Sequence, residues 1–395
     1  MVRISPHRIP TRKRRIIAYI IHYAIRIPHL IWRILTLRLW RERSFPAIVR
    51  KVLIIRADGL GDVVMSMPAI SALHDLFPDA EFTLLAGAPS RALIPHLCSI
   101  ERVIWLDLPW AQRGVKRIDW SELRRVLAEI RRADFDLVID LRGDFRNILL
   151  SLFMGRGYRV GFGCSGCGYL LDREIPSGED RHQVEHALDA ARALGATAGE
   201  VRFDLAVFEE DRRSVDDRLA DLGVEGNRFM VMHPGAQWAG RQWTVSGYAE
   251  IADRAIRVLD LPVVMTGIAR ESGLCRQVME RMDDNPIDLT DQISFGEFLA
   301  LLSRAHLFFG VDSGPMHLAA ALGVPTVVLF GAGDPHAIGP YGAGHVVVSE
   351  GHRFPCSPCA QDHCRCEGAD CMAAISVDSV WKAIVSGRDC PTTDS

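Results

Sequence analysis

Four loops of the chain combine carboxylates, arginines or histidines with glycines directly after apolar runs. The first reads Arg56-Ala-Asp58-Gly-Leu-Gly61-Asp62 and closes the apolar run 52–56. Its glycines permit a tight turn, and Asp62 falls at the start of the helix predicted next, where the helix dipole favours an ionised carboxylate. Such a carboxylate can accept a proton from an attacking hydroxyl group. The alternative is that Asp58 or Asp62 only caps the helix.

A second loop reads VDSGPMH and contains Asp312, Ser313, Gly314 and His317. It follows the apolar run 306–311 and opens a predicted helix. The free N–H groups at the start of that helix, with the Ser313 hydroxyl, would form an anion site suited to a diphosphate, which His317 would also contact. The alternative is a capped helix with the histidine packed inside.

The third loop, HPGAQWAGRQW, follows the apolar run 229–233 and carries Gly235 and Arg241. A glycine-rich turn with an arginine is a second candidate for binding phosphate. The tryptophans Trp238 and Trp243 are costly to expose. They either pack on a ligand and line a cleft, or anchor the loop hydrophobically while the arginine stays solvated.

The fourth loop ends the apolar run 136–142 and reads DLRGDFR, with Arg142 and Arg146. Two arginines beside a ligand site suit an anionic acceptor, whereas the alternative is surface salt bridging. The first loop has neither a G-x-G-x-x-G sequence nor a Walker Lys-Ser, so it lacks the sequence motifs typical of nucleotide-cofactor binding. We therefore expect no cofactor.

Apolar runs that alternate with helical patterns position these loops. In the first half the runs are 52–56, 81–87, 101–107, 136–142 and 158–163, with helices at about 60–77 and 120–133. In the second half the runs are 229–233, 262–267, 306–311 and 325–330, with helices at about 245–259, 271–282, 295–305 and 315–322. Ser294 and Glu297 form a capping box for the third of these helices. Apolar strands separated by helices are typical of parallel sheets covered on both faces, so we expect an α/β fold of two Rossmann-like halves that bind ligands beyond the carboxyl ends of their strands.

Length and composition agree with two such halves and shorter flanking segments. The chain has 395 residues, 48% hydrophobic and 24% charged, which leaves room for two or three domains and excludes a mostly disordered protein. The expected divisions are a basic amphipathic arm at 1–50, a Rossmann-like acceptor domain at 51–208, a linker helix at 209–226, a Rossmann-like nucleotide-sugar domain at 227–375, and a C-terminal helix and tail at 376–395.

The arm is strongly basic. Residues 1–51 contain 13 Lys and Arg and one acid, which gives them a charge of +12. Because the net charge of the chain is −3, the remaining residues carry −15. Polar residues recur every three, four or seven positions in the apolar stretch 15–36, which places them on one helical stripe. This pattern favours a helix lying in the interface of an anionic membrane over a spanning helix, which needs about 20 consecutive apolar residues. The alternative is a helix packed on the body, and nucleic acid is disfavoured because the arm is too apolar.

Ten cysteines are too few for a disulfide scaffold at this length, and no cleavable signal peptide is evident, so we expect a reducing cytosol. Cys356, Cys359, Cys364 and Cys371 share one short segment, in which C-x₂-C resembles a structural zinc site. The favoured alternatives are reduced cysteines packing a loop, or a local disulfide.

Together, the stretches IIRADGLGDVVMSMPAI, DLVIDLRGDFRN, HPGAQWAGRQW and FFGVDSGPMHLAAALGVPTVVLFG resemble glycosyltransferase family 9, the bacterial heptosyltransferases of lipopolysaccharide core assembly. The resemblance covers about 50–375 and implies a GT-B fold, whose two Rossmann-like domains face a central cleft. It also implies inverting, metal-independent transfer from a nucleotide sugar. In the heptosyltransferases the donor is ADP-heptose and the acceptor a glycolipid, which implies a cytoplasmic enzyme peripheral to the inner face of the membrane.

The resemblance assigns roles by position. Asp62 matches the catalytic base, and Arg146 falls where a basic residue meets the acidic acceptor. From their places in the first and fourth loops we also expect Asp58, Gly61 and Arg142 on the acceptor side. On the donor side, Arg241 matches a residue that binds phosphate, Asp312 one that contacts sugar hydroxyls, and Ser313 and Gly314 lie at the diphosphate, while Gly267 and Glu271 are candidates for the base and ribose. From the loops themselves we add Gly235 and His317 as donor-side residues. The alternatives are a GT-B enzyme with another nucleotide sugar, including a sugar-nucleotide epimerase, and a non-catalytic membrane scaffold.

Overall fold

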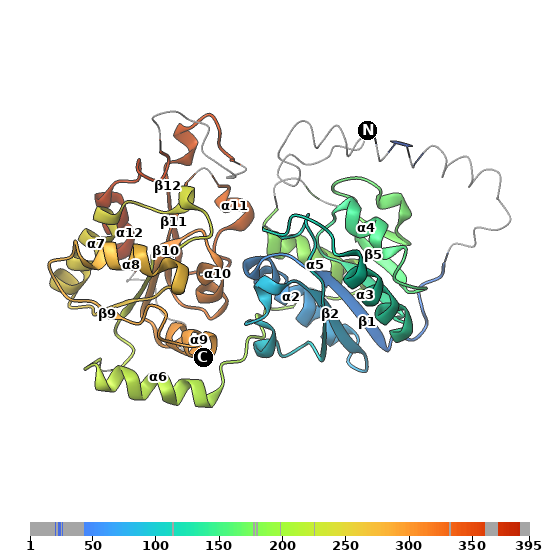
Figure 1. Ribbon diagram of the computed structural model, residues 1–395, viewed down its shortest axis with the longest axis horizontal. Helices are drawn as coiled ribbons and strands as arrows, with labels where there is room; N and C mark the ends of the chain where they lie inside the picture. Colours follow the sequence, from blue (N-terminus) through green and yellow to red (C-terminus); the bar gives the residue numbers. More distant parts are fainter. Residues whose placement is uncertain are drawn as a thin grey trace. The chain divides into compact units, whose positions relative to one another are not determined.

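The computed structural model describes residues 43–112, 114–176, 178, 181–197, 199–224, 226–331, 333–359 and 370–387, with Ile20, Tyr23, Ala24 and Arg26. The chain divides into two compact units, Met1–Asp204 and Leu205–Ser395 (Figure 1). Each unit contains a six-stranded sheet, and every strand pairing in both sheets is parallel. The α/β fold predicted from the alternating pattern is confirmed.

The first sheet has the order β3-β2-β1-β4-β5-β6, so β1 lies near its centre. Its strands are β1 (Lys51–Arg56), β2 (Glu81–Ala86), β3 (Arg102–Trp105), β4 (Leu137–Asp140), β5 (Tyr158–Phe162) and β6 (Arg173–Ile175). Its main helices are α2 (Leu60–Leu76), α3 (Trp120–Ala133), α4 (Phe145–Ser151) and α5 (Gln183–Leu194). Leu53 and Ile55 of β1 pack with Val126 and Ile130 of α3 in one buried cluster. Because strand side chains alternate in direction, Val52 and Ile54 face the opposite side.

The second sheet has the order β12-β11-β10-β7-β8-β9. Its strands are β7 (Met230–His233), β8 (Val263–Met265), β9 (Ile287–Asp288), β10 (Leu307–Val311), β11 (Thr326–Phe330) and β12 (His345–Ser349). Its helices are α6 (Glu209–Asp221), α7 (Val245–Leu259), α8 (Ser272–Met279), α9 (Phe295–Arg304), α10 (Gly314–Ala321), α11 (Pro335–Ile338) and α12 (Val377–Gly387). Residues of α7, α8 and α12 share one buried cluster with this sheet.

Most predicted elements are confirmed, but several observed elements were not predicted. The capping box at Ser294 forms, with Glu297 accepting from the Ser294 N–H at 2.7 Å. The strands β6, β9 and β12 and the helices α4, α5 and α11 have no counterpart in the prediction. All of these except α5 are short or only partly buried, so their apolar periodicity is weak. The helix α5 has twelve residues and a buried apolar face, and the sequence analysis missed it.

The helix predicted as a linker, α6, lies in the second unit. It packs on α9, where the Ser214 hydroxyl donates to the Glu297 carboxylate at 2.5 Å and Arg304 pairs with Asp216. The expected arm falls almost wholly outside the described residues. Among the residues that are described, no helix is long and apolar enough to cross a membrane.

Candidate functional site

In the first unit, one buried guanidinium organises the carboxyl end of the sheet. Arg56 is the last residue of β1 and is 4% exposed. Its Nε donates to the backbone oxygen of Asp62 at 3.1 Å, and Nη1 donates to the backbone oxygen of Leu141, just beyond β4, at 3.1 Å. Burial lowers the pKa of Arg56, while the Asp62 and Asp140 carboxylates act to raise it. The arginine therefore ties the loop after β1 to the end of β4.

Asp62 stands in the first turn of α2, and both of its carboxylate oxygens are oriented. Oδ1 accepts from Arg56 Nη2 at 3.3 Å, and Oδ2 accepts from the Gly59 N–H at 3.3 Å, the reciprocal contact of a capping box. Gly61 lies in the same helical turn. The Asp62 side chain nevertheless remains 44% exposed. The carboxylate thus caps α2 and also presents an ionisable oxygen to the surface, so capping and chemistry are compatible here.

Asp58 is buried and paired, unlike Asp62. Its Oδ1 forms an ion pair with Arg142, and Oδ2 lies 3.6 Å from Arg56 Nε without accepting a hydrogen bond from any described residue. Arg142 also donates to the backbone oxygen of Trp110 at 2.6 Å. The two arginines and two aspartates of the first and fourth loops therefore form a single network.

Asp140 is a buried carboxylate that the sequence analysis did not single out. Its oxygens accept from the Asn147 side-chain amide at 3.1 Å and from the N–H groups of Arg142 and Gly143. Burial raises its pKa to about 6, although these hydrogen bonds act to lower it. The signal that could have revealed it is a charged residue closing the apolar strand β4.

Arg146 is the more open of the two acceptor-side arginines, at 39% side-chain exposure. Its Nε and Nη2 donate hydrogen bonds to the two Asp144 carboxylate oxygens at 2.8 and 2.6 Å. Its guanidinium lies 5.4 Å from the centre of the Trp110 ring. Burial acts to raise the pKa of Asp144, but the hydrogen bond and charge of Arg146 and the charge of Arg142 outweigh it and lower that pKa. Arg146 therefore forms a salt bridge and still presents positive charge to the solvent.

In the second unit, Arg241 is anchored at the start of α10. Its Nη1 lies 3.0 Å from the backbone oxygen of Asp312 and 3.2 Å from its Oδ1. Asp312 is 3% exposed, whereas the Arg241 side chain is 23% exposed. A cation at the positive end of a helix is unfavourable alone, so this arrangement suits an additional anion.

Ser313 precedes α10 and supplies a second feature of an anion site. Its hydroxyl oxygen is buried, accepts no hydrogen bond from any described residue and makes no capping bond to the helix. Gly314 begins the helix, and His317 lies in its first turn, 7% exposed. A buried hydroxyl at a helix N-terminus is available to a ligand oxygen.

Gly235 and Glu271 are brought together at the ends of β7 and β8. A Cβ atom on Gly235 would lie 2.4 Å from the Glu271 carboxyl carbon, so a larger residue there would displace the Glu271 carboxylate. The Glu271 carboxylate pairs with His233 at 3.3 Å and accepts from the Ile268 N–H at 3.1 Å. Burial acts to raise the pKa of Glu271, but the bond to His233 outweighs it and lowers that pKa. Gly267 lies beside Glu271 in the adjoining turn.

Of the two tryptophans, Trp243 is a core anchor rather than a ligand-stacking residue. It is 4% exposed, its Nε1 donates to the backbone oxygen of Ile375 at 3.0 Å, and its ring meets Tyr248 and Phe309 edge-on. Its role is to fix the end of the third loop to the hydrophobic core.

The cysteine segment is described only in part. Cys356, Cys359 and Cys371 lie in the described residues, whereas Cys364 lies outside them. Within the described part of the chain, no group of three or more His, Cys, Asp or Glu side chains is arranged to hold a metal ion.

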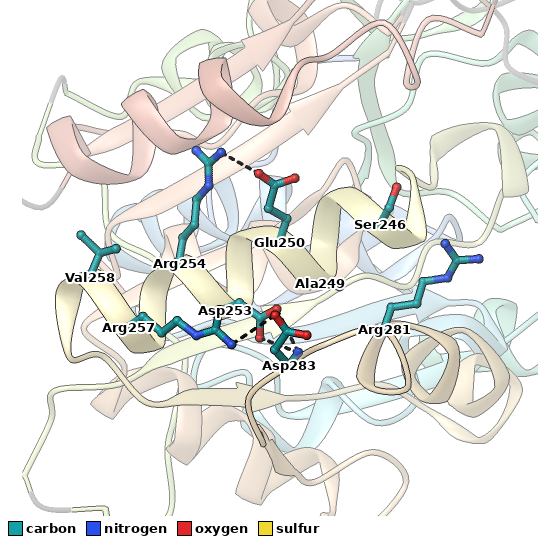
Figure 2. A pocket seen from close by; sticks show the side chains of 9 residues that line it. All are labelled: Ser246, Ala249, Glu250, Asp253, Arg254, Arg257, Val258, Arg281 and Asp283. Atoms are coloured by element: carbon teal, nitrogen blue, oxygen red, sulfur yellow. Dashed lines mark hydrogen bonds and ion pairs between the residues drawn. The ribbon is translucent and has the colours of Figure 1, made fainter.

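A surface hollow of about 530 Å³ lies away from these loops, along α7. Figure 2 shows Arg254 directed at Glu250 and Arg257 directed at Asp283. These pairs are 2.6 and 3.2 Å long, and Asp253 caps the 283–284 turn through backbone N–H groups. Apart from the exposed Arg281, its charged side chains pair within the fold, and none of its lining residues belongs to the four loops, so the hollow is not a candidate for the donor site.

Asp140→Asn is expected to remove a pH-dependent contribution to stability. Because the folded-state pKa is raised to about 6, the wild type gains stability as pH falls through that value and loses it above. The free energy of unfolding of the wild type minus that of the variant should be about 1 kcal/mol larger at pH 5 than at pH 8. Denaturant unfolding at both pH values measures this, with the exposed Asp79→Asn as control. An offset between Asp140→Asn and wild type that does not change with pH would contradict it.

Comparison with known proteins finds relatives of this chain and solved structures with a similar fold. A lipopolysaccharide heptosyltransferase 1 of Pseudomonas aeruginosa is 26% identical over 316 residues, which are 80% of this chain and 87% of that protein. The crystal structure of a family 9 glycosyl transferase from Veillonella parvula superposes with a TM-score of 0.72 at 21% identity, covering 88% of this chain and 99% of that one. The ADP-heptose lipopolysaccharide heptosyltransferase II of E. coli gives a TM-score of 0.66 at 21% identity, covering 86% and 98%.

The family description that matches is glycosyltransferase family 9 (heptosyltransferase), over residues 123–369. This range includes the fourth loop and both donor-side loops. The solved neighbours have the GT-B fold. The chain therefore belongs to glycosyltransferase family 9 and is a glycosyltransferase.

Proposed function

We propose that this enzyme transfers heptose from ADP-heptose to a lipopolysaccharide-core or related cell-envelope glycan, with inversion and without a catalytic metal. The donor follows from relatives named as lipopolysaccharide and ADP-heptose heptosyltransferases. The observation that carries the mechanism is Asp62, a half-exposed carboxylate oriented by Arg56 and by the Gly59 N–H.

In the proposed reaction, Asp62 accepts the proton of the acceptor hydroxyl group. The hydroxyl oxygen forms a bond to the anomeric carbon of the sugar as the bond from that carbon to the ADP oxygen breaks. The electron pair of the broken bond leaves with ADP, and attack from the opposite face inverts the anomeric centre. Arg56 contributes by holding the carboxylate in one orientation, since misplacement of a reacting group slows a reaction steeply.

In this proposal the second unit stabilises the negative charge that develops on the leaving diphosphate. Arg241 and the N-terminus of α10 provide positive charge, and the buried Ser313 hydroxyl provides a neutral donor. Preorganised groups of this kind stabilise the charge that grows on a departing diphosphate. Gly235, Gly267 and Glu271 shape the neighbouring turns, where we place the nucleoside, and Asp312 and His317 complete the donor side.

The acceptor binds, in this proposal, at the carboxyl end of the first sheet. Arg142 and Arg146 offer cationic surface for an acidic sugar or phosphate, and Trp110 lies under Arg146. Asp58 and Gly61 belong to the loop that the acceptor meets. This assigns 51–208 to the acceptor and 227–375 to the nucleotide sugar.

We further propose that residues 1–50 attach the enzyme to the inner face of the cytoplasmic membrane, where a lipid-linked acceptor is found. The support is the charge of +12 on residues 1–51 together with the apolar sequence of the arm. Cation-rich amphipathic segments bind anionic lipid surfaces in this way.

Asp62→Asn should abolish most transfer while leaving the fold and ADP affinity intact. Loss of a general base lowers the rate by about 10²–10⁴-fold. The assay is transfer of labelled heptose from ADP-heptose to lipid-linked acceptor, with the exposed Asp79→Asn as control. Transfer at the wild-type rate by a folded Asp62→Asn protein would exclude this base. A wild type with no transfer activity would instead favour the non-catalytic scaffold.

Arg241→Gln should weaken ADP binding by about 10- to 100-fold, because a charged hydrogen bond to phosphate contributes about 1.5–3 kcal/mol. Isothermal calorimetry with ADP measures the affinity. Arg276→Gln removes the same charge from an exposed position of α8 and should bind ADP normally. Equal affinities for wild type and a folded Arg241→Gln protein would show that the diphosphate binds elsewhere.

A further inference from the structure

The amino end of the first sheet bears a basic and apolar surface that the proposed reaction does not use. We call it the amino-edge patch and define it by Arg43, Arg131, Arg132 and Arg156 with the apolar side chains Ile48 and Phe153. Ile48 is 66% and Phe153 56% exposed, and the four arginines are exposed as well.

Hydrogen bonds link the segments that carry four of these residues, although the segments are distant in sequence. Arg43 Nη1 donates to the backbone oxygen of Arg156 at 3.1 Å, and Arg131 Nε donates to the backbone oxygen of Phe153 at 2.7 Å. Ile48 lies between Arg43 and the start of β1. Because α3 runs back across the sheet, its last turn, which carries Arg131 and Arg132, reaches the same edge.

The charge of the patch is not cancelled within the fold. Arg132 and Arg156 have no side-chain partner among the described residues. Of the nearby acids, Asp136 accepts from the N–H groups of Arg50 and Lys51, and Asp172 is 12% exposed and pairs with Arg43 and Arg159. Asp79, Glu81 and Asp134 are exposed carboxylates of this edge, against the exposed cations Arg43, Arg50, Lys51, Arg131, Arg132 and Arg156. The net charge of the exposed side chains at this edge is therefore positive.

We infer that the amino-edge patch is a second contact with an anionic membrane surface, made by the folded body beside the arm. Arginines around an exposed aromatic and an exposed aliphatic side chain match a lipid interface, where the charge meets headgroups and the apolar tips enter the acyl boundary. The position of Arg43 favours this occupant, because the basic residues 1–42 join the body on the patch itself. This inference rests on the proposed membrane attachment and adds a binding surface to it.

Vesicle partitioning of the full chain tests the inference. The test variant is Arg132→Gln/Arg156→Gln, which removes two charges and no hydrogen bond that the structure contains. The matched control is Arg124→Gln/Arg125→Gln, at exposed positions nearer the start of α3. Vesicles of phosphatidylcholine, with and without one-third phosphatidylglycerol, are compared at low ionic strength.

The test variant should bind the anionic vesicles roughly 10- to 30-fold more weakly than wild type, at about fivefold per cation, while the control changes less than about twofold. Phe153→Ser should also weaken binding, and should do so in high salt, where the charge contribution is screened. Wild-type binding by both patch variants would overturn the inference while leaving attachment through the arm intact. No vesicle binding by the wild type would overturn both.

Discussion

A buried cation at the end of β1 is the constraint on which the first unit depends. Arg56 is almost wholly removed from water, and an unpaired buried guanidinium would be strongly destabilising. Its partners are Asp62, Asp58 and the backbone oxygen of Leu141. Satisfying the charge therefore fixes the loop after β1 against the end of β4. The same contacts that stabilise the fold also orient the carboxylate proposed to do the chemistry.

The second unit also has an arginine held by an aspartate, but this arginine is less buried. Arg241 is held by Asp312 as Arg56 is held by its aspartates, and both lie at the carboxyl end of a parallel sheet. Arg241 keeps part of its surface in solvent and lies at a helix N-terminus, so it can still interact with an anion. In the proposed mechanism the buried Arg56 positions the base, whereas the partly exposed Arg241 binds phosphate. This division follows from burial rather than residue type.

Sequence patterns predicted the fold class and the position of each loop, because apolar strands and the glycines after them leave strong local signals. Pairing across the sheet was not predictable in the same way. The Asp58–Arg142 ion pair and the contact of Arg56 with Leu141 join residues about 85 positions apart in sequence. Trp243 illustrates a further difficulty, since an aromatic residue in a polar loop can face a ligand or the core. Such outcomes depend on tertiary packing that local periodicity does not encode.

The most direct test of the account is the transfer rate of Arg56→Lys. Lysine keeps the buried charge, but its single nitrogen cannot reproduce the separate bonds to Asp62 and Leu141 that the guanidinium makes. If Arg56 positions the base, transfer should fall by about 10- to 100-fold with ADP affinity and fold unchanged. A folded Arg56→Lys enzyme that transfers heptose at the wild-type rate would contradict the account.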